Sequence, residues 1–158
     1  MNFTCNKYGD VVVFVDGACP GNGFRGARAG VGVWFDDDHD LNVSSSMPGV
    51  QTNNNAEIYA AVIAIDMLLD YTNESCVEIV TDSIYLCNCV SKWIHKWKRN
   101  GWRNCRGKLV ANKDMLEQLD NRINAMDSVI FTYVRAHNNI YGNEQADKLA
   151  RKGADTFN

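Results

Sequence analysis

The chain has 158 residues, of which 46% are hydrophobic and 22% charged, with a formal net charge of −3. This length and composition are typical of one globular domain and exclude a disordered or low-complexity protein. The longest apolar run, at 11–15, is far shorter than the roughly 20 residues of a membrane-spanning helix. The N-terminus has no signal-peptide pattern, so we expect an intracellular protein, away from membranes, whose six cysteines remain free thiols.

The first third of the chain predicts three strands in an antiparallel meander. The β-branched run at 11–15 is typical of a strand buried on both faces, and it ends at Asp16. Further strands are expected at 31–35 and 41–45, on either side of an acidic turn that we interpret as solvated, without a metal. From about 54 to 70, apolar residues recur at the spacing of an amphipathic helix.

The remainder alternates between strands and helices. We expect a strand at 77–81, a helix from 83 to about 98, a helix at 112–125 and a strand at 129–134. A short last helix is expected to be capped by Asn143 and ended by Gly153. This order predicts an α/β domain with a mixed five-stranded sheet, to which the later strands are added by right-handed crossovers.

Residues 83–113 form a basic segment. They contain eight lysines and arginines and no acid, whereas the other residues carry eight bases and all 19 acids. Three of the four tryptophans, Trp93, Trp97 and Trp102, also lie there. Cations interleaved with flat rings are suited to phosphates, sugars and bases, so the segment predicts a nucleic-acid interface. The alternative is a solvated helix whose tryptophans pack inward.

Asp16 and Asp82 each follow a predicted strand directly. If these strands are parallel neighbours, the two carboxylates lie side by side at one edge of the sheet. Their repulsion requires a cation or a shared proton, and hard divalent cations with oxygen ligands support phosphodiester cleavage. Glu57 and Asp147, each expected in the first turn of its helix, are candidate third and fourth ligands. Taken singly, each acid is better explained as a cap or a surface charge.

Four motifs together resemble the signatures of type 1 ribonuclease H in order and spacing. They are Asp16-Gly17-Ala18, the segment from Thr52 to Glu57, Thr81-Asp82-Ser83, and His137 followed by 142–150. The segment at 101–108 is similar to the basic protrusion of the cellular, eukaryotic-type enzymes. The resemblance implies a ribonuclease H-like fold with strand order 3-2-1-4-5. From the length we expect a single catalytic domain over 1–158, and the resemblance covers a core at about 11–153. Because the first strand begins by Val11, we expect no separate hybrid-binding domain.

The activity implied by the resemblance is hydrolysis of the RNA strand of RNA/DNA hybrids, leaving 5′-phosphate and 3′-hydroxyl ends. Two Mg²⁺ ions, or Mn²⁺ as a substitute, would be held by Asp16 between them, by Glu57 and Asp82 at one and by Asp147 at the other. His137 would assist proton transfer or product release. RNA-strand contacts are implied for Cys19, Asn22, Asn53 and Asn54, and DNA-strand contacts for Thr52, Tyr85, Trp93, Trp97 and Asn112. The expected partner is the hybrid duplex, bound by a monomer.

The chain departs from the family pattern at two places. Val50 stands where many eukaryotic relatives have an arginine, so we expect weaker anchoring of the DNA strand. Ala136 replaces the usual glycine before the histidine, and 138–139 replaces a small pair, which bears on loop mobility and rate. These departures leave a non-catalytic hybrid-binding protein of the same fold as an alternative. A transposase-type or resolvase-type DNA nuclease is a third interpretation, disfavoured by the 2′-hydroxyl-binding motif at 52–57.

Overall fold

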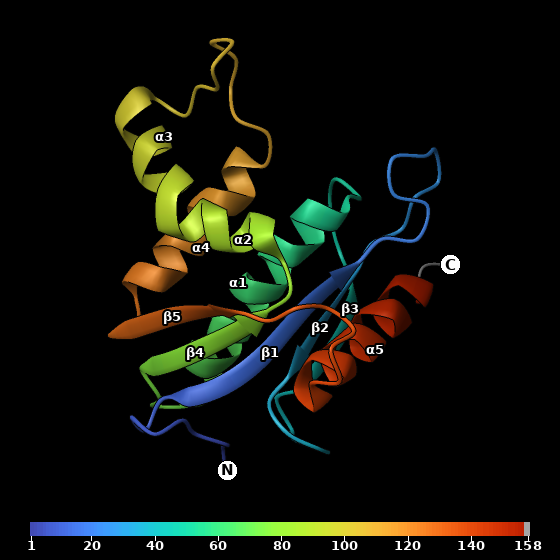
Figure 1. The fold of residues 1–158 in the computed structure, drawn as a ribbon, viewed down its shortest axis with the longest axis vertical. Helices are drawn as coiled ribbons and strands as arrows, with labels where there is room; N and C mark the ends of the chain where they lie inside the picture. The colour runs from blue at the N-terminus through green and yellow to red at the C-terminus, as the bar shows by residue number, and fades with distance from the viewer. Residues whose placement is uncertain (157–158) are drawn as a thin grey trace.

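A five-stranded mixed sheet lies at the centre of the molecule (Figure 1). The structure, a computed structural model, describes residues 1–156. The strands are paired in the order β3-β2-β1-β4-β5, as predicted. The first three form an antiparallel meander, and β4 and β5 are added parallel to β1. Their bounds are β1 Val11–Ala18, β2 Gly30–Trp34, β3 Val43–Ser46, β4 Cys76–Thr81 and β5 Ser128–Tyr133.

Helices cover the two faces of the sheet. In Figure 1 α5 lies in front of the sheet, against β1, β2 and β3, while α1 lies behind it against β1 and β2 and contacts α4. The α-helices are α1 Asn53–Tyr71, α2 Ile84–Asn88, α3 Ile94–Asn100, α4 Lys113–Asn124 and α5 Tyr141–Asp155. A π-helical turn, η1 Cys89–Trp93, joins α2 to α3.

The main core fills the space between the sheet and α1. Val11, Val13 and Val15 alternate along β1 with partly exposed residues and are fully buried, as are Ile58 and Ile65 of α1. Alternation on the strand and helical spacing on α1 direct these side chains to one layer. On the other face of the sheet, the backbone of α5 lies very close to that of β2. A Cβ at Gly32 would lie only 2.7 Å from the backbone nitrogen of Ala150 in α5.

Two predicted helices have different bounds in the structure. The helix expected from 83 to about 98 is divided into α2, η1 and α3, and it continues to Gly101, whose left-handed backbone ends it. The last helix begins after Ile140 and extends past Gly153, so the predicted cap at Asn143 and stop at Gly153 were both wrong. Asn143 is buried inside the helix, and a Cβ at Gly153 would lie 2.8 Å from the backbone of Ser45 in β3.

Three smaller predictions concerned the cysteines, the acidic turn and membrane-spanning helices. All six cysteines are free, and the acidic residues after β2 form a turn before β3. Within residues 1–156, no helix has the length and apolar character needed to cross a bilayer.

The segment at 101–110 projects beyond α3 (Figure 1), and Arg103 and Leu109 form an antiparallel bridge within it.

Candidate active site

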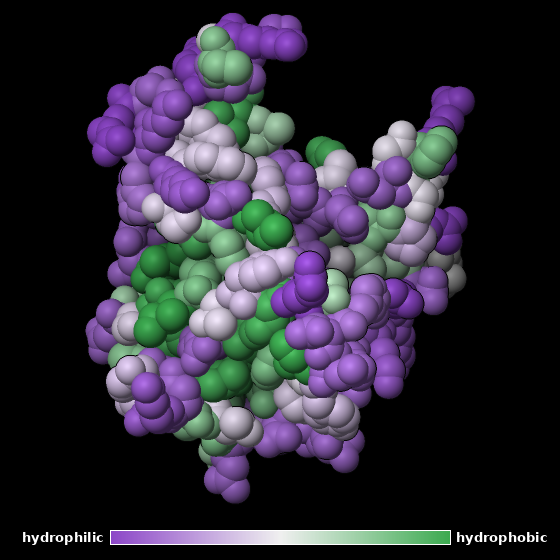
Figure 2. All heavy atoms as spheres, in the orientation of Figure 1, coloured by the Kyte–Doolittle hydropathy of each residue, from purple (hydrophilic) through white to green (hydrophobic). Residues whose placement is uncertain are grey.

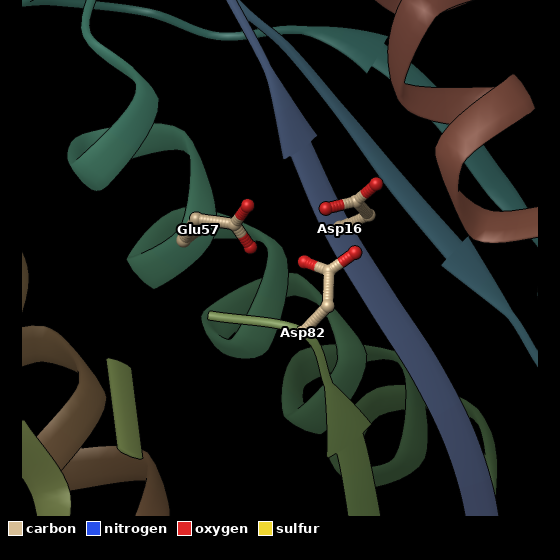
Figure 3. A group of neighbouring side chains, drawn as sticks. All are labelled: Asp16, Glu57 and Asp82. Atoms are coloured by element: carbon tan, nitrogen blue, oxygen red, sulfur yellow. The ribbon is translucent and has the colours of Figure 1, made fainter. Parts of the chain in front are cut away.

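Three carboxylates from three elements meet at the edge of the sheet where β1 and β4 end (Figure 3). Asp16 lies near the end of β1, Glu57 projects from α1 and Asp82 follows β4. One oxygen from each carboxylate lies within 4.8 Å of those of the other two. Because β1 and β4 are parallel neighbours, their carboxyl ends bring Asp16 and Asp82 together, as the sequence predicted.

Gly17 allows the helix that carries Glu57 to approach β1. A Cβ at this position would lie 2.7 Å from the Cβ of Ala56 and 2.7 Å from the backbone nitrogen of Glu57. Such contacts are too short for carbon atoms, so any side chain at position 17 would push α1 away from the strand. Thr52 begins the same helix, and its Oγ1 accepts a hydrogen bond from the backbone N–H of Asn55 at 3.1 Å.

Two of the three carboxylates, those of Asp16 and Glu57, are buried. Asp16 is 4% exposed and Glu57 is 8% exposed, and Glu57 Oε2 is buried without a hydrogen-bond partner among the described residues. Burial, and then repulsion from Glu57 and Asp82, raises the pKa of Asp16 well above its usual range. Burial also raises the pKa of Glu57, although its hydrogen bond with Asp16 opposes this increase. A hard divalent cation would satisfy these oxygens, so the residues fit such an ion.

Asp147, the predicted fourth ligand, lies outside this trio. Its Oδ2 pairs with the Nε of Arg151 at 3.2 Å. Its charge still helps to raise the pKa of Asp16, after the larger effects of burial and the other acids. Asp147 lies in the second turn of α5, and Glu57 lies just past the first turn of α1. The expected placement of both acids in first turns was therefore wrong, and helix dipoles have less influence on them than predicted.

Asn143 is a site residue that the sequence analysis missed. It is 3% exposed, and its Nδ2 donates a hydrogen bond to Asp82 Oδ2 at 3.1 Å. The spacing of four residues between Asn143 and Asp147 places both on one face of α5. That spacing was a usable signal. Because asparagine is common at helix N-caps, however, Asn143 was predicted to cap the last helix by hydrogen bonding to its backbone.

The predicted RNA-strand residues lie around the start of α1, and two of them, Asn22 and Asn53, are joined by a hydrogen bond. Asn22 Oδ1 accepts a hydrogen bond from the backbone N–H of Asn53 at 3.0 Å. Cys19 is buried, and its thiol contacts the carbonyl of Gln51 at 3.5 Å. Asn54 is exposed in the first turn of the helix. The turn after β1 and the start of α1 therefore form one polar surface beside the carboxylates.

The predicted DNA-strand aromatics form a row of rings. Ring centroids are separated by 5.9 Å from Tyr85 to Trp93, by 5.8 Å from Trp93 to Trp97, and by 6.1 Å from Trp97 to Trp102. Asn112 Nδ2 donates to the Tyr85 hydroxyl at 3.1 Å, and burial raises the pKa of Tyr85 to about 12. Trp93 and Trp97 also pack against the core, so the inward-packing alternative holds alongside the nucleic-acid interpretation.

A hollow of about 480 Å³ lies between the segment before α1 and the start of α4. Val50, Asn55, Asn112 and Lys113 are among its lining residues, and Val50 is 65% exposed. Thr52, which like Asn112 is a predicted DNA-strand residue, lies two residues beyond Val50 and caps α1. An apolar side chain therefore occupies the position at which the family resemblance implies an arginine.

His137 is not part of the carboxylate cluster. It is exposed on the segment between β5 and α5, and its backbone has a left-handed φ of 57°. Asn139 in the same segment has a φ of 59°. Two non-glycine residues in this conformation are uncommon, although histidine and asparagine tolerate it better than most.

The surface around the site is hollowed. Figure 2 shows a notch between the lobe formed by α3 with the segment at 101–110 and the loop at 19–28, with hydrophilic side chains on both sides. The lobe carries the basic residues at 92–108, and the loop carries the predicted RNA-strand residue Asn22. A duplex could therefore contact both predicted strand-binding surfaces.

Comparison with known proteins gives a consistent result. The RNase H family model matches residues 8–155. Ribonuclease H1 of Mus musculus is 44% identical over 144 residues, which cover 91% of this chain and 50% of that protein. Ribonuclease H of Roseobacter denitrificans is 37% identical over 151 residues, which cover 94% of this chain and 97% of that protein. The chain thus spans about half the length of its mammalian relative and nearly all of the bacterial one.

A solved structure shows the same architecture. The crystal structure of LC9-RNase H1, described as a type 1 RNase H with the type 2 active-site motif, aligns with a TM-score of 0.75 at 26% identity. The alignment covers 91% of this chain and 71% of that one.

Proposed function

The chain belongs to the RNase H family, and from this premise we propose that it hydrolyses the RNA strand of RNA/DNA hybrids. The observation that carries the proposal is the cluster of Asp16, Glu57 and Asp82, in which a buried Glu57 oxygen has no hydrogen-bond partner within residues 1–156. Phosphodiester hydrolysis requires negative charge to be stabilised beside an activated water. A bare cluster of three acids would repel a phosphate, so the proposal includes divalent cations.

We propose that Asp16, Glu57, Asp82 and Asp147 together hold two Mg²⁺ ions, for which Mn²⁺ can substitute. When bound, such ions supply a water nucleophile and stabilise the leaving oxygen, which gives 5′-phosphate and 3′-hydroxyl ends. Asp16 would be the ligand common to the two ions, and one of its oxygens lies within 4.8 Å of oxygens of Glu57 and Asp82. Asn143 holds the Asp82 carboxylate in one orientation through its hydrogen bond. His137, on its exposed segment, is the candidate for proton transfer or product release.

The two strands of the hybrid are distinguished on separate surfaces. Cys19, Asn22, Asn53 and Asn54 offer short polar groups and backbone amides suited to 2′-hydroxyls. The row of rings from Tyr85 to Trp97 offers flat apolar surfaces suited to deoxyriboses. Rejection of duplex RNA and of duplex DNA then follows from two independent requirements.

The proposal is tested by incubating the protein with an end-labelled RNA/DNA hybrid, duplex RNA, duplex DNA and single-stranded RNA. Each substrate is tested with Mg²⁺, with Mn²⁺ and with a chelator. We expect metal-dependent cleavage of the RNA strand of the hybrid only. Hybrid binding without cleavage under every condition would support the non-catalytic hybrid-binding alternative, and cleavage of duplex DNA would support a DNA nuclease.

Matched variants connect the activity to the cluster. Asp82→Asn keeps the shape of the side chain and removes its charge, so we expect hybrid binding without cleavage. Glu74→Gln removes an equal charge from an exposed position outside the cluster and should cleave like the parent. If Asp82→Asn cleaved at the parental rate, the assignment of the metal ligands would be wrong.

A further inference from the structure

A hollow of about 470 Å³ lies beside the carboxylate cluster, and it is lined by one charged side chain to which no role has been assigned, that of Arg151. The other lining residues come from the end of β1 and the turn after it, from the start of α1, and from α5. They are Gly17, Ala18, Cys19, Pro20, Asn53 and Asp147.

Arg151 occupies this hollow as the partner of a proposed metal ligand. It lies one turn after Asp147 on α5, with its Nε 3.2 Å from Asp147 Oδ2. The side chain of Arg151 is 63% exposed and that of Asp147 is 28% exposed. An ion pair this accessible to water contributes little to folding, so exchanging it for another partner costs little.

The remaining lining residues indicate what that partner is. Cys19 and Asn53 are residues at which the RNA strand is expected, and the backbone of any strand that lies along them places a phosphodiester in the hollow. A guanidinium group matches a phosphate in shape and charge, and binds it through two parallel hydrogen bonds. Asp147 alone would repel such a phosphate.

We propose that Arg151 and this hollow form a subsite for the RNA-strand phosphodiester adjacent to the one that is cleaved. Arg151 leaves Asp147 when that phosphate binds, and both oxygens of Asp147 become available as metal ligands. This inference rests on the proposed function, because it requires the RNA strand to lie along Cys19 and Asn53. It gives Arg151 two effects: it favours hybrid binding, and it opposes metal binding at Asp147 in the free protein.

The experiment compares Arg151→Ala and Arg151→Lys with Lys152→Ala, all on the Asp82→Asn background so that the hybrid stays intact. Lys152 is the matched control because it is the next residue on α5, carries the same charge and lines a different hollow. Hybrid binding is measured by fluorescence anisotropy at several salt concentrations. We expect Arg151→Ala to weaken binding about 10-fold and to lower the salt slope by about one, with a smaller loss for Arg151→Lys.

Chemically altered hybrids locate the contact. Single methylphosphonates, which lack the phosphate charge, are placed at successive positions of the RNA strand. We expect one position adjacent to the cleavage site to weaken binding of the Asp82→Asn parent and to leave binding of its Arg151→Ala derivative unchanged. Equal losses in the two proteins at every position would overturn the subsite.

Calorimetric titration of Mg²⁺ into the free proteins tests the second effect. With Asp82 intact, Arg151→Ala should bind Mg²⁺ several-fold more tightly than the parent, while Lys152→Ala should not. Weaker Mg²⁺ binding by Arg151→Ala would contradict the competition for Asp147. If the parent fails to bind the hybrid at all, the proposed function fails; if it binds and Arg151→Ala binds equally well, only this inference fails.

Discussion

Asp16 is held in an environment that suits a metal and disfavours the metal-free protein. Burial and neighbouring acids raise the pKa of Asp16, so in the absence of metal the charged form of its carboxyl group is destabilised. A group whose pKa is raised on folding reduces stability progressively as the pH rises from its ordinary value, near 4, towards the raised value. The free energy of unfolding of the metal-free protein should therefore decrease from about pH 4 upwards.

We predict that Asp16→Asn stabilises the protein in chelator at pH 8 by about 2 kcal/mol, which is a Tm increase of roughly 4–8 °C. The gain should shrink as the pH falls to 4 and below, where the carboxyl group becomes neutral in the unfolded state as well as in the folded state. Thermal unfolding across this pH range measures the effect, with Glu74→Gln as the control for a lost surface charge. A constant difference at every pH would show that charge is not its origin.

Asn143 acts on the site through Asp82. We predict that Asn143→Ala destabilises the protein by about 1–2 kcal/mol, because it removes a buried hydrogen bond and leaves a small void. Loss of the orienting contact should also weaken Mg²⁺ binding about 10-fold or more. Chemical denaturation and calorimetry measure the two effects. Asn121→Ala, at an exposed position of α4, is the control, and an equal loss of metal affinity there would rule out a positioning role for Asn143.

Val50 offers a test in which function is gained. It is exposed beside the hollow that contains Asn112 and Lys113. We predict that Val50→Arg tightens hybrid binding several-fold and steepens its salt dependence by about one unit, because one more phosphate contact forms. Binding isotherms at several salt concentrations measure this. Val50→Gln adds length without charge, and an equal gain from it would attribute the effect to packing.

The sequence was informative at residues whose role follows from position along one element. Asp16 and Asp82 follow strands, so parallel pairing was enough to place them together. Asn143 was missed because its contact with Asp82 depends on how α5 lies against the sheet. Arg151 pairs with Asp147 within α5, but the hollow that it lines depends on the same docking. The hydrogen bond between Asn143 and Asp82 joins residues 61 positions apart, and no local pattern encodes that distance.

At the scale of elements, the contact between α5 and β2 positions the site residues that α5 carries. Gly32 allows the backbones of the two elements to meet, and α5 carries Asn143, Asp147 and Arg151. A Cβ at position 32 would have to displace the helix, because its neighbours are main-chain atoms that cannot rotate away.

We predict that Gly32→Ala destabilises the protein by about 3 kcal/mol and reduces cleavage beyond the fraction that unfolds. Gly9→Ala is the control, since nothing lies within 4 Å of its added Cβ and only the positive φ is strained, at about 1–2 kcal/mol. Urea denaturation and specific activity at a temperature where both variants are folded measure the difference. Equal losses in the two variants would show that α5 does not need this close approach.

Element boundaries were predicted less well than element types. Strand and helix periodicities identified every strand and most helices, because burial of one face repeats along each element. The π-helical turn at Cys89–Trp93 does not interrupt that periodicity enough to be recognised. At α5, Asn143 and Gly153 were interpreted as cap and stop, although the first binds Asp82 and the second packs against β3. Asparagine and glycine are common at helix ends, but at these two positions they are required by tertiary contacts.

For the whole molecule, the separation of charge matters most. The segment at 83–113 contains eight lysines and arginines and no acidic residue. The rest of the chain, which carries the carboxylate cluster, has an excess of acidic residues. A duplex is therefore attracted to the lobe of α3 and the segment at 101–110, and repelled by much of the remaining surface. Under the proposed function, we therefore expect the lobe to bind the duplex first and to orient the carboxylates toward a phosphate.

We predict that the triple variant Arg103→Gln, Arg106→Gln and Lys108→Gln weakens hybrid binding more than it slows cleavage of bound substrate. Removing up to three phosphate contacts should reduce the salt slope by as much as about 2.7. Single-turnover cleavage at saturating protein separates the two effects. A fall in the single-turnover rate equal to the loss of affinity would place these residues in the chemical step.

The close contact at Gly17 also makes the carboxylate cluster depend on the folded chain. Asp16 and Glu57 are 41 positions apart in the chain, and their carboxylates meet only after α1 has docked on β1 across that glycine. A nascent, partly unfolded or proteolysed chain therefore has no complete catalytic centre, even if its basic lobe already adheres to nucleic acid. Under the proposed function, cleavage therefore begins only after α1 has docked on β1.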